Sequence, residues 1–398
     1  MRKSSLSRVL NVAAIAGLIL ANSVQAQSAW SEVVAAAKGQ TVYFNAWGGG
    51  ETSNAYIAWA AEVVQKRFGV TVKHVKISDA AEVVKRVQTE VQAGRTEQGS
   101  VDLIWVNGEN FKNLKQSGLL FGPWAETLPN WSLVDSSKPV RVDFSVPTDG
   151  MEAAWGTAQL TFIADHAVTA TPPRSANELL AFAKANPGRV SYPKLPDFHG
   201  TTFVKQILLE LTPDAAALQQ PVTPEAFKRA TAPLWPYLDQ LHSIAWRQGQ
   251  SFPASAAEMH RLLADGELKL SLTFNPNEAA NLIVTRQLPA TAYSFGFTGG
   301  TIGNVHFLAI PVNAKAKAGA QIFANFLQSP EAQARKADVA VWGDGSVLDS
   351  AKLPEQFRAA MSKTAPGALA EKVPTLAEPH ASWVEALESE WLKRYGTR

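Results

Sequence analysis

Several loops of this sequence place polar or aromatic side chains directly after a predicted β-strand. In open α/β sheets, ligands bind outside the carboxyl ends of the strands, so these loops are the first candidates for a binding site. A further polar loop contains His199 and Thr201. The loops after predicted strands are Trp47-Gly48-Gly49-Gly50, Asn107-Gly108-Glu109, Trp155-Gly156-Thr157 and Asn275-Pro276-Asn277-Glu278.

These residue types suit the binding of a small polar molecule. Glycine lets backbone N–H groups approach a ligand, and asparagine both donates and accepts hydrogen bonds. Glu109 and Glu278 could balance a cation, and Trp47 or Trp155 could stack on a sugar, a ring or an ammonium group, with a cation–π attraction of about 0.5–2 kcal/mol. The predicted ligand-binding residues are therefore Trp47, Gly48, Gly49, Asn107, Glu109, Trp155, Thr157, His199, Thr201, Asn275, Asn277 and Glu278.

Each candidate also has a purely structural explanation. Tryptophan occurs 12 times in the chain, so any one ring is more often part of a core than of a site. Glu278 stands in the first turn of a predicted helix, where the helix dipole favours an acid. Glycine and asparagine are common in turns and caps. The sequence leaves both explanations open.

Signatures of an enzyme or a metal site are missing from the sequence. It lacks the G-x-S-x-G, H-E-x-x-H, phosphate-loop and G-x-G-x-x-G motifs, and it has no internal repeat of the kind that a structural or adhesive protein would show. The seven histidines have no metal-ligand spacing and there is no cysteine, so neither a metal nor another cofactor is predicted. A periplasmic hydrolase or lyase that uses paired carboxylates stays open as the alternative function, because such pairs need no local motif.

The first 26 residues are typical of a secretory signal peptide. Arg2, Lys3 and Arg8 precede an apolar run, and Val24 and Ala26 occupy the positions that determine cleavage. The run is too short to span a bilayer, and no later stretch approaches about 18 uninterrupted apolar residues. We therefore expect a periplasmic protein without a membrane anchor.

The charge composition argues against two classes of binding partner. Removal of the leader changes the ratio of Lys+Arg to Asp+Glu from 37:35 to 34:35, and a nearly neutral chain favours neither nucleic acid nor a membrane surface as a partner. Without cysteine the fold depends on its core alone. A mature chain of about 370 residues is longer than a single hydrophobic core usually supports, which predicts two lobes. We expect a monomer that diffuses freely.

Strands and helices alternate along the chain, which predicts βαβ units. Strands are expected at 41–46, 70–77 and 101–106, with helices between them, and capping boxes begin helices at Ser175 and Ser255. The predicted organisation is a signal peptide at 1–26, a first lobe at 27–150 and 296–345, a second lobe at 151–295, and a C-terminal helical segment at 346–398 that packs on the lobes.

Three stretches of the chain resemble bacterial extracellular solute-binding proteins of the YnjB type, the periplasmic components of ABC importers. They are Phe44–Gly49, Val101–Glu109 and Ala316–Ala337. The resemblance implies a two-lobed type II periplasmic-binding-protein fold, each lobe having a mixed, mostly parallel sheet with helices on both faces. It also implies hinge closure on a small-molecule ligand, and an ABC permease with its ATPase subunits as partners. A cationic ring compound, a sugar, a polyamine or an oxyanion would all suit the candidate residues.

Overall fold

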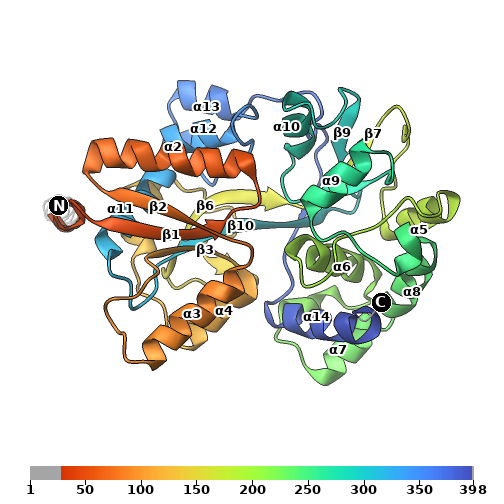
Figure 1. Cartoon of the computed structure of the whole chain (residues 1–398), viewed down its shortest axis with the longest axis horizontal. Coiled ribbons are helices and arrows are strands. Elements are labelled where there is room, and N and C mark those ends of the chain that lie inside the picture. Colours follow the sequence, from red (N-terminus) through yellow and green to blue (C-terminus); the bar gives the residue numbers. More distant parts are fainter. Residues whose placement is uncertain (1–27, 397–398) are drawn as a thin grey trace, which may run out of the picture.

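A computed structural model describes residues 28–396 of the chain, and the expected signal peptide at 1–26 lies outside the described residues. The described residues form two α/β lobes that lie side by side (Figure 1). Within 28–396, no helix combines the length and the apolar character needed to cross a bilayer.

The first lobe is built on a mixed sheet with the strand order β2-β1-β3-β10-β6. β1 pairs in parallel with β2 and β3, whereas β10 runs antiparallel to β3 and β6. A short strand, β11, extends β10 at its other end. The strands are β1 (Thr41–Trp47), β2 (Thr71–Ile77), β3 (Leu103–Val106), β6 (Glu152–Gln159), β10 (Thr301–Ala309) and β11 (Thr375–Leu376).

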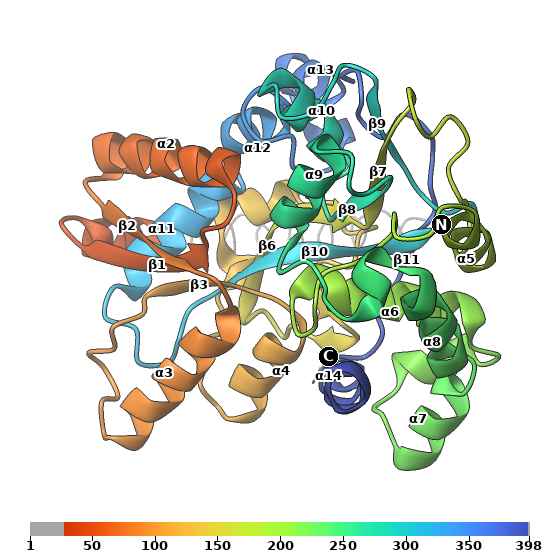
Figure 2. The same cartoon turned by 45° about the vertical axis from the view of Figure 1, so that its right-hand side comes forward.

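Helices cover both faces of this sheet (Figures 1 and 2). α2 buries Tyr56 and Ile57 in one core together with α11, and α3 and α4 bury apolar side chains in a second core on the opposite face. α2 ends because Gly69 adopts the left-handed conformation, and Asp79 caps α3. The helices are α2 (Glu51–Phe68), α3 (Ala80–Gln92), α4 (Gly108–Gln116), α11 (Lys317–Leu327), α12 (Pro330–Ala337) and α13 (Glu355–Met361).

The second lobe has a small sheet in the order β8-β7-β9, with helices packed around it. Ser175 and Ser255 cap α5 and α9, as their capping boxes predict. The elements are β7 (Thr161–Asp165), β8 (Ser271–Thr273), β9 (Ala292–Phe295), α5 (Ala176–Ala185), α6 (Phe198–Leu211), α7 (Pro224–Thr231), α8 (Leu234–Ile244), α9 (Ala256–Ala264), α10 (Glu278–Val284) and α14 (Ser382–Tyr395).

The prediction of a mostly parallel sheet in the second lobe is wrong. β7 pairs antiparallel with both β8 and β9. Five helices, α5 to α9, follow β7 before β8 begins, so the chain does not alternate one helix with each strand as a βαβ unit does. Mixed pairing in the first lobe, by contrast, agrees with the expectation.

Short elements complete the described chain. β4 and β5 form a two-stranded ribbon in the loop-rich region of the first lobe. Single turns of 3-10 helix occur in the connections. These elements are β4 (Val142–Asp143), β5 (Val146–Pro147), η1 (Ala125–Thr127), η2 (Pro129–Leu133), η3 (Ala215–Gln219), η4 (Trp246–Gly249) and η5 (Ser350–Lys352).

Two kinds of segment join the lobes. β6 and β10 pair along most of their length and continue from the first lobe into the second (Figure 2). The C-terminal segment crosses as well: α13 packs on α12 in the first lobe, whereas α14 contributes Trp383, Trp391 and Tyr395 to the core of the second lobe. Both the central strands and the last residues of the described chain therefore connect the lobes.

Candidate ligand-binding groove

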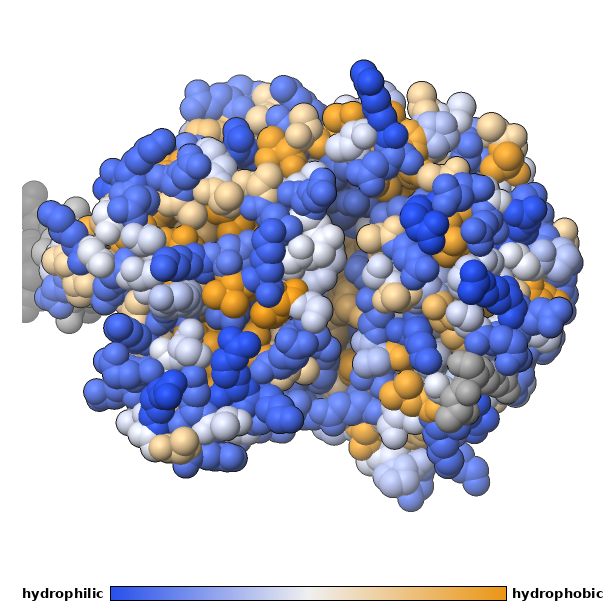
Figure 3. All heavy atoms as spheres, in the orientation of Figure 1, coloured by the Kyte–Doolittle hydropathy of each residue, from blue (hydrophilic) through white to orange (hydrophobic). Residues whose placement is uncertain are grey.

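A groove is hollowed between the two lobes (Figure 3). We call it the interlobe groove: the loops after β1, β2 and β3 form its first-lobe wall, and the start of α6 with α14 forms its second-lobe wall. The walls touch where Asn113 of α4 donates a hydrogen bond to Glu385 of α14 over 3.2 Å. The groove lies at the carboxyl ends of the parallel strands, where the fold class places ligands.

Trp47 is the exposed aromatic residue of the first wall. It ends β1 with 41% of its surface exposed, and its indole folds back over the glycine loop. A Cβ atom on Gly49 would lie 2.5 Å from this ring, and one on Gly48 would lie 2.6 Å from Lys76. The two glycines are therefore needed for the indole and the strand end to pack, which leaves one face of Trp47 open to a solute.

The loop after β3 positions Glu109. Gly108 has a φ of 63°, and its N–H donates to a carboxylate oxygen of Asp143 over 2.6 Å. The amide of Asn107 donates to the Val305 carbonyl of β10 over 2.5 Å, so Asn107 ties the loop to a crossing strand. Glu109 follows in the first turn of α4, where burial raises the pKa of its carboxyl to about 7, against the lowering effect of nearby Lys205.

The second wall brings another acidic side chain toward Glu109. Thr201 of α6 donates its hydroxyl hydrogen bond to Glu388 of α14 over 2.7 Å. Burial raises the pKa of Glu388 to about 7, while the Thr201 bond and Lys205 lower it. The negative charge of Glu388 in turn raises the pKa of Glu109, so carboxyls from opposite lobes lie within electrostatic range of each other.

His199 lies in the first turn of α6 beside two other titratable groups. Its backbone N–H donates to the capping carboxylate of Asp197 over 2.9 Å. Burial and, to a smaller extent, the neighbouring His199 lower the pKa of His260 to about 3. Burial raises the pKa of Glu278, while hydrogen bonds from asparagines and the charge of His199 lower it. Residues 28–396 contain no group of three or more side chains placed to hold a metal ion.

Asn275 and Asn277 do not present their amides to the groove. Asn275 donates to the Trp342 carbonyl over 3.2 Å, and Asn277 donates to the Gly343 carbonyl over 2.6 Å. The loop that accepts these bonds follows α12 and packs in the first-lobe core through Trp342. Both asparagines therefore link the second lobe to the first.

Trp155 and Thr157 are also structural in this arrangement. Trp155 is 0% exposed and packs against Trp105 and Trp342 with ring centroids 5.0 and 5.6 Å away, so it has no free face for a solute. The backbone N–H of Thr157 donates to the Gly345 carbonyl over 3.0 Å. The ligand role predicted for Trp155 is therefore corrected to a core role by its burial.

Sequence reasoning missed three residues of the groove. Phe198, with 41% of its surface exposed, and Glu388 stand on the second wall, and Asp79 lies near both Glu109 and Glu388. Phe198 immediately precedes the predicted His199, so the same loop could have pointed to it. Nothing local marks Glu388, because α14 reaches the groove only through the packing of the last residues into the second lobe.

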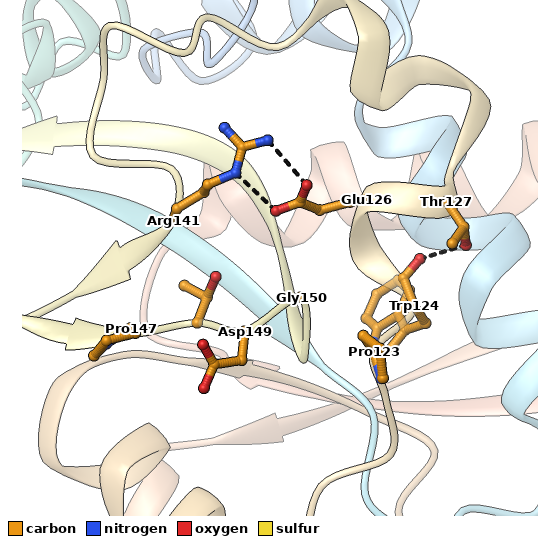
Figure 4. A pocket seen from close by; sticks show the side chains of 9 residues that line it. Pro123, Trp124, Glu126, Thr127, Arg141, Pro147, Asp149 and Gly150 are labelled. Atoms are coloured by element: carbon orange, nitrogen blue, oxygen red, sulfur yellow. Dashed lines mark hydrogen bonds and ion pairs between the residues drawn. The ribbon is translucent and has the colours of Figure 1, made fainter. Parts of the chain in front are cut away.

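A separate pocket of about 480 Å³ lies in the loop-rich region of the first lobe (Figure 4). Arg141 and Glu126 form a two-pronged ion pair at its rim, with distances of 2.8 and 2.9 Å. None of the predicted ligand-binding residues lines this pocket. Its lining consists of Pro123, Trp124, Glu126, Thr127, Arg141, Pro147, Thr148, Asp149 and Gly150.

Solved structures of periplasmic binding proteins share this fold. The periplasmic binding protein AfuA of Actinobacillus pleuropneumoniae aligns with a TM-score of 0.63 at 14% identity, covering 90% of this chain and 99% of that chain. A spermidine/putrescine ABC transporter protein of Listeria monocytogenes aligns with a TM-score of 0.63 at 15% identity, covering 89% and 98%. These likenesses establish the periplasmic-binding-protein fold.

Sequence comparison identifies the family. Residues 58–365 match the family model described as bacterial extracellular solute-binding protein. The chain is 57% identical over 370 residues to protein YnjB of Escherichia coli strain K12, covering 93% of this chain and 95% of that protein. The chain therefore belongs to the bacterial extracellular solute-binding proteins, as a relative of YnjB.

Proposed function

We propose that this protein captures a small polar solute in the interlobe groove and delivers it to the permease and ATPase subunits of an ABC importer. One observation carries the proposal: α4 of the first lobe and α14 of the second meet at the hydrogen bond from Asn113 to Glu385, and each helix carries a further acid there, Glu109 and Glu388. Exposed aromatic rings accompany them on both walls, at Trp47 and Phe198. Side chains from two lobes can surround a solute completely only when the lobes close on it.

Hinge closure supplies the mechanism. A solute that contacts both walls has a higher affinity for the closed arrangement, so it shifts the population toward that arrangement. We propose that β6 and β10 bend where they cross into the second lobe. The boundaries between the lobes would then lie near residues 150 and 296. The permease then distinguishes the loaded protein by its closed shape. No reaction on the solute is needed, and the comparisons do not support the alternative of a hydrolase or lyase.

Proteins with this fold differ widely in what they bind. The AfuA structure contains fructose-6-phosphate, and another neighbour is a ferric ion-binding protein of Pasteurella haemolytica. The fold alone therefore names no solute. We propose that the mature protein acts in the periplasm as a monomer after removal of residues 1–26.

Native mass spectrometry of the protein purified from its own periplasm tests the proposal. We expect a retained small molecule of unchanged mass after prolonged incubation, because binding without conversion leaves the solute intact. Small-angle X-ray scattering should then show a smaller radius of gyration with the solute than without it. Conversion of the solute, or equal radii at saturation, would contradict capture by hinge closure.

A further inference from the structure

The acidic side chains of the interlobe groove indicate the class of solute. We propose that the groove selects an organic cation whose positive group lies between the carboxyl groups of Glu109 and Glu388. This inference rests on the proposed function, because it concerns the same groove. Glu109 lies four residues before Asn113 on α4 of the first lobe, and Glu388 lies three residues after Glu385 on α14 of the second. Residues three or four apart share one face of a helix, so both carboxyls lie on the faces that the hydrogen bond from Asn113 to Glu385 brings together. One positive group between them would hold the two lobes together.

The protein itself does not neutralise these two carboxyls. Lys205, the nearby cation, forms an ion pair with Glu378 over 2.6 Å, and the two side chains are 1% and 3% exposed. Glu388 accepts the hydroxyl of Thr201, and Glu109 accepts the amide of Asn110 over 2.9 Å. Between residues 28 and 396, no Lys or Arg forms an ion pair with either groove carboxyl. Their countercharge is left for the solute to supply.

Several of the backbone groups that would favour an anion are already used, whereas no side chain caps the start of α2. The N–H of Gly48 donates to the Ile77 carbonyl over 3.0 Å, and the N–H of Gly108 donates to Asp143. At the start of α6, the carboxylate of Asp197 accepts the N–H groups of His199 and Gly200 over 2.9 and 3.2 Å. A phosphate or carboxylate solute would therefore find these donors occupied and would face acidic side chains.

Aromatic surface on both walls suits the same class of solute. Trp47 and Phe198 are each 41% exposed, although most large apolar side chains of the chain are buried. The face of an aromatic ring attracts a cation by about 0.5–2 kcal/mol, depending on how far the cation is desolvated. An ammonium or a cationic ring would gain from the rings and the carboxyls together, whereas a neutral sugar would gain from the rings and hydrogen bonds alone.

Proton release distinguishes a cation from other solutes. Burial holds the pKa values of both carboxyls at about 7, with Lys205 lowering each of them and Asp79 raising each of them. Glu385 also raises the pKa of Glu388, and Asp143 lies near Glu109. A bound cation favours the ionised carboxylates, so its binding expels protons near neutral pH and weakens as the pH falls. An anion would instead take up protons and bind better at lower pH.

Fractionation of natural small molecules tests the class of solute. A small-molecule extract of the bacterium that makes the protein is separated at pH 7 on cation-exchange and anion-exchange resins, and each fraction is tested for thermal stabilisation of the mature protein. We expect the stabilising activity in the fraction retained by the cation exchanger. Activity in the anion-exchange fraction or in the unretained fraction would overturn the inference but not the proposed function. Absence of activity from all fractions would overturn both.

Matched variants connect the activity to the two carboxyls. With the stabilising fraction, Glu109→Gln and Glu388→Gln should each reduce the apparent affinity at pH 7.5 by roughly tenfold or more. Glu62→Gln, at an exposed position of α2, makes the same change of charge outside the groove and should leave the affinity unchanged. The affinity of the unaltered protein should fall by roughly tenfold between pH 7.5 and 6. Unchanged affinity in both groove variants, or an affinity that rises as the pH falls, would overturn the inference.

Discussion

Some side chains of the groove are suited to binding a solute but reduce the stability of the folded protein. A buried carboxyl that ionises without a countercharge destabilises the fold, because water no longer solvates the charge. Glu109 and Glu388 are such groups, and the pKa of each lies near 7 rather than at the usual value for an exposed glutamate. The folded protein therefore holds protons between about pH 4.3 and 7 that the unfolded chain has released.

Glu109→Gln should consequently stabilise the protein at pH 8 and leave its stability almost unchanged at pH 4. The raised pKa gives a stabilising contribution that is complete below the unfolded value and is lost as the pH rises through 7. Removing the charge should increase the free energy of unfolding at pH 8 by about 1–2 kcal/mol, since the side chain is partly exposed and solvent screens part of the effect. Urea denaturation at both pH values measures the difference. An equal effect at pH 4 and 8 would show that charge is not its cause.

Trp47→Ala should weaken solute binding without altering the fold. The ring is exposed on the first wall, so its loss removes a contact with the solute and leaves the core intact. We expect an affinity loss of about 1–2 kcal/mol, or roughly fivefold to thirtyfold. Tyr43→Ala is the matched control, because Tyr43 lies on the same strand and is 39% exposed. Calorimetric titration of the solute into both variants checks this; equal affinities would remove Trp47 from the site.

Residue types pointed to part of the groove but not to their partners. Trp47, Glu109 and His199 lie on its walls, and their contact with a solute stays a prediction. Trp155 stands in an equally suggestive pattern and is buried. The loop containing Trp342 covers Trp155. The spacing of residues around Trp155 does not predict this contact, because the covering loop comes much later in the sequence.

At the scale of elements, strand and helix alternation predicted the first lobe well. Strands at 41–46, 70–77 and 101–106 agree with β1, β2 and β3 to within a few residues at their ends. The second lobe was harder to predict because its strands are short, and β8 has only three residues. Its strand direction depends on contacts with β7, about 100 residues earlier, and no local pattern encodes such pairing.

One buried ion pair joins α6 to the C-terminal segment. Lys205 and Glu378 are both almost fully buried, and Asn304 of β10 also donates to Glu378 over 3.1 Å. Lys205→Met should destabilise the protein by about 3–5 kcal/mol, because it leaves the Glu378 carboxylate buried without its countercharge. Thermal or urea denaturation measures this loss.

A second substitution provides the control for the ion pair. Lys205→Met with Glu378→Gln removes both charges and keeps an acceptor for Asn304, so most of the lost stability should return. Failure of the double variant to recover would mean that Lys205 stabilises the protein through other contacts, such as that of its Nζ atom, 4.5 Å from the centre of the Phe144 ring.

For the whole molecule, hydrogen bonds between lobes tune the balance of open and closed arrangements. Asn277 of the second lobe donates to the Gly343 carbonyl of the first. Asn277→Ala should favour the open arrangement by about 0.5–1.5 kcal/mol, raising the radius of gyration without solute and weakening binding by roughly twofold to tenfold. Scattering and titration measure the two effects. Asn186→Ala is the control, because it removes a hydrogen bond to the Phe182 carbonyl at the end of α5 and should change neither the radius of gyration nor the affinity. Equal changes in the two variants would contradict a role for Asn277 between the lobes.

The position of α14 has a consequence for biogenesis. Trp383, Trp391 and Tyr395 complete the core of a lobe whose first strand begins at Thr161. A chain that is threaded across a membrane from its N-terminus delivers these rings last. Export through a translocation channel would thus leave the second lobe without part of its core until α14 emerges, so this lobe would finish folding only late in export.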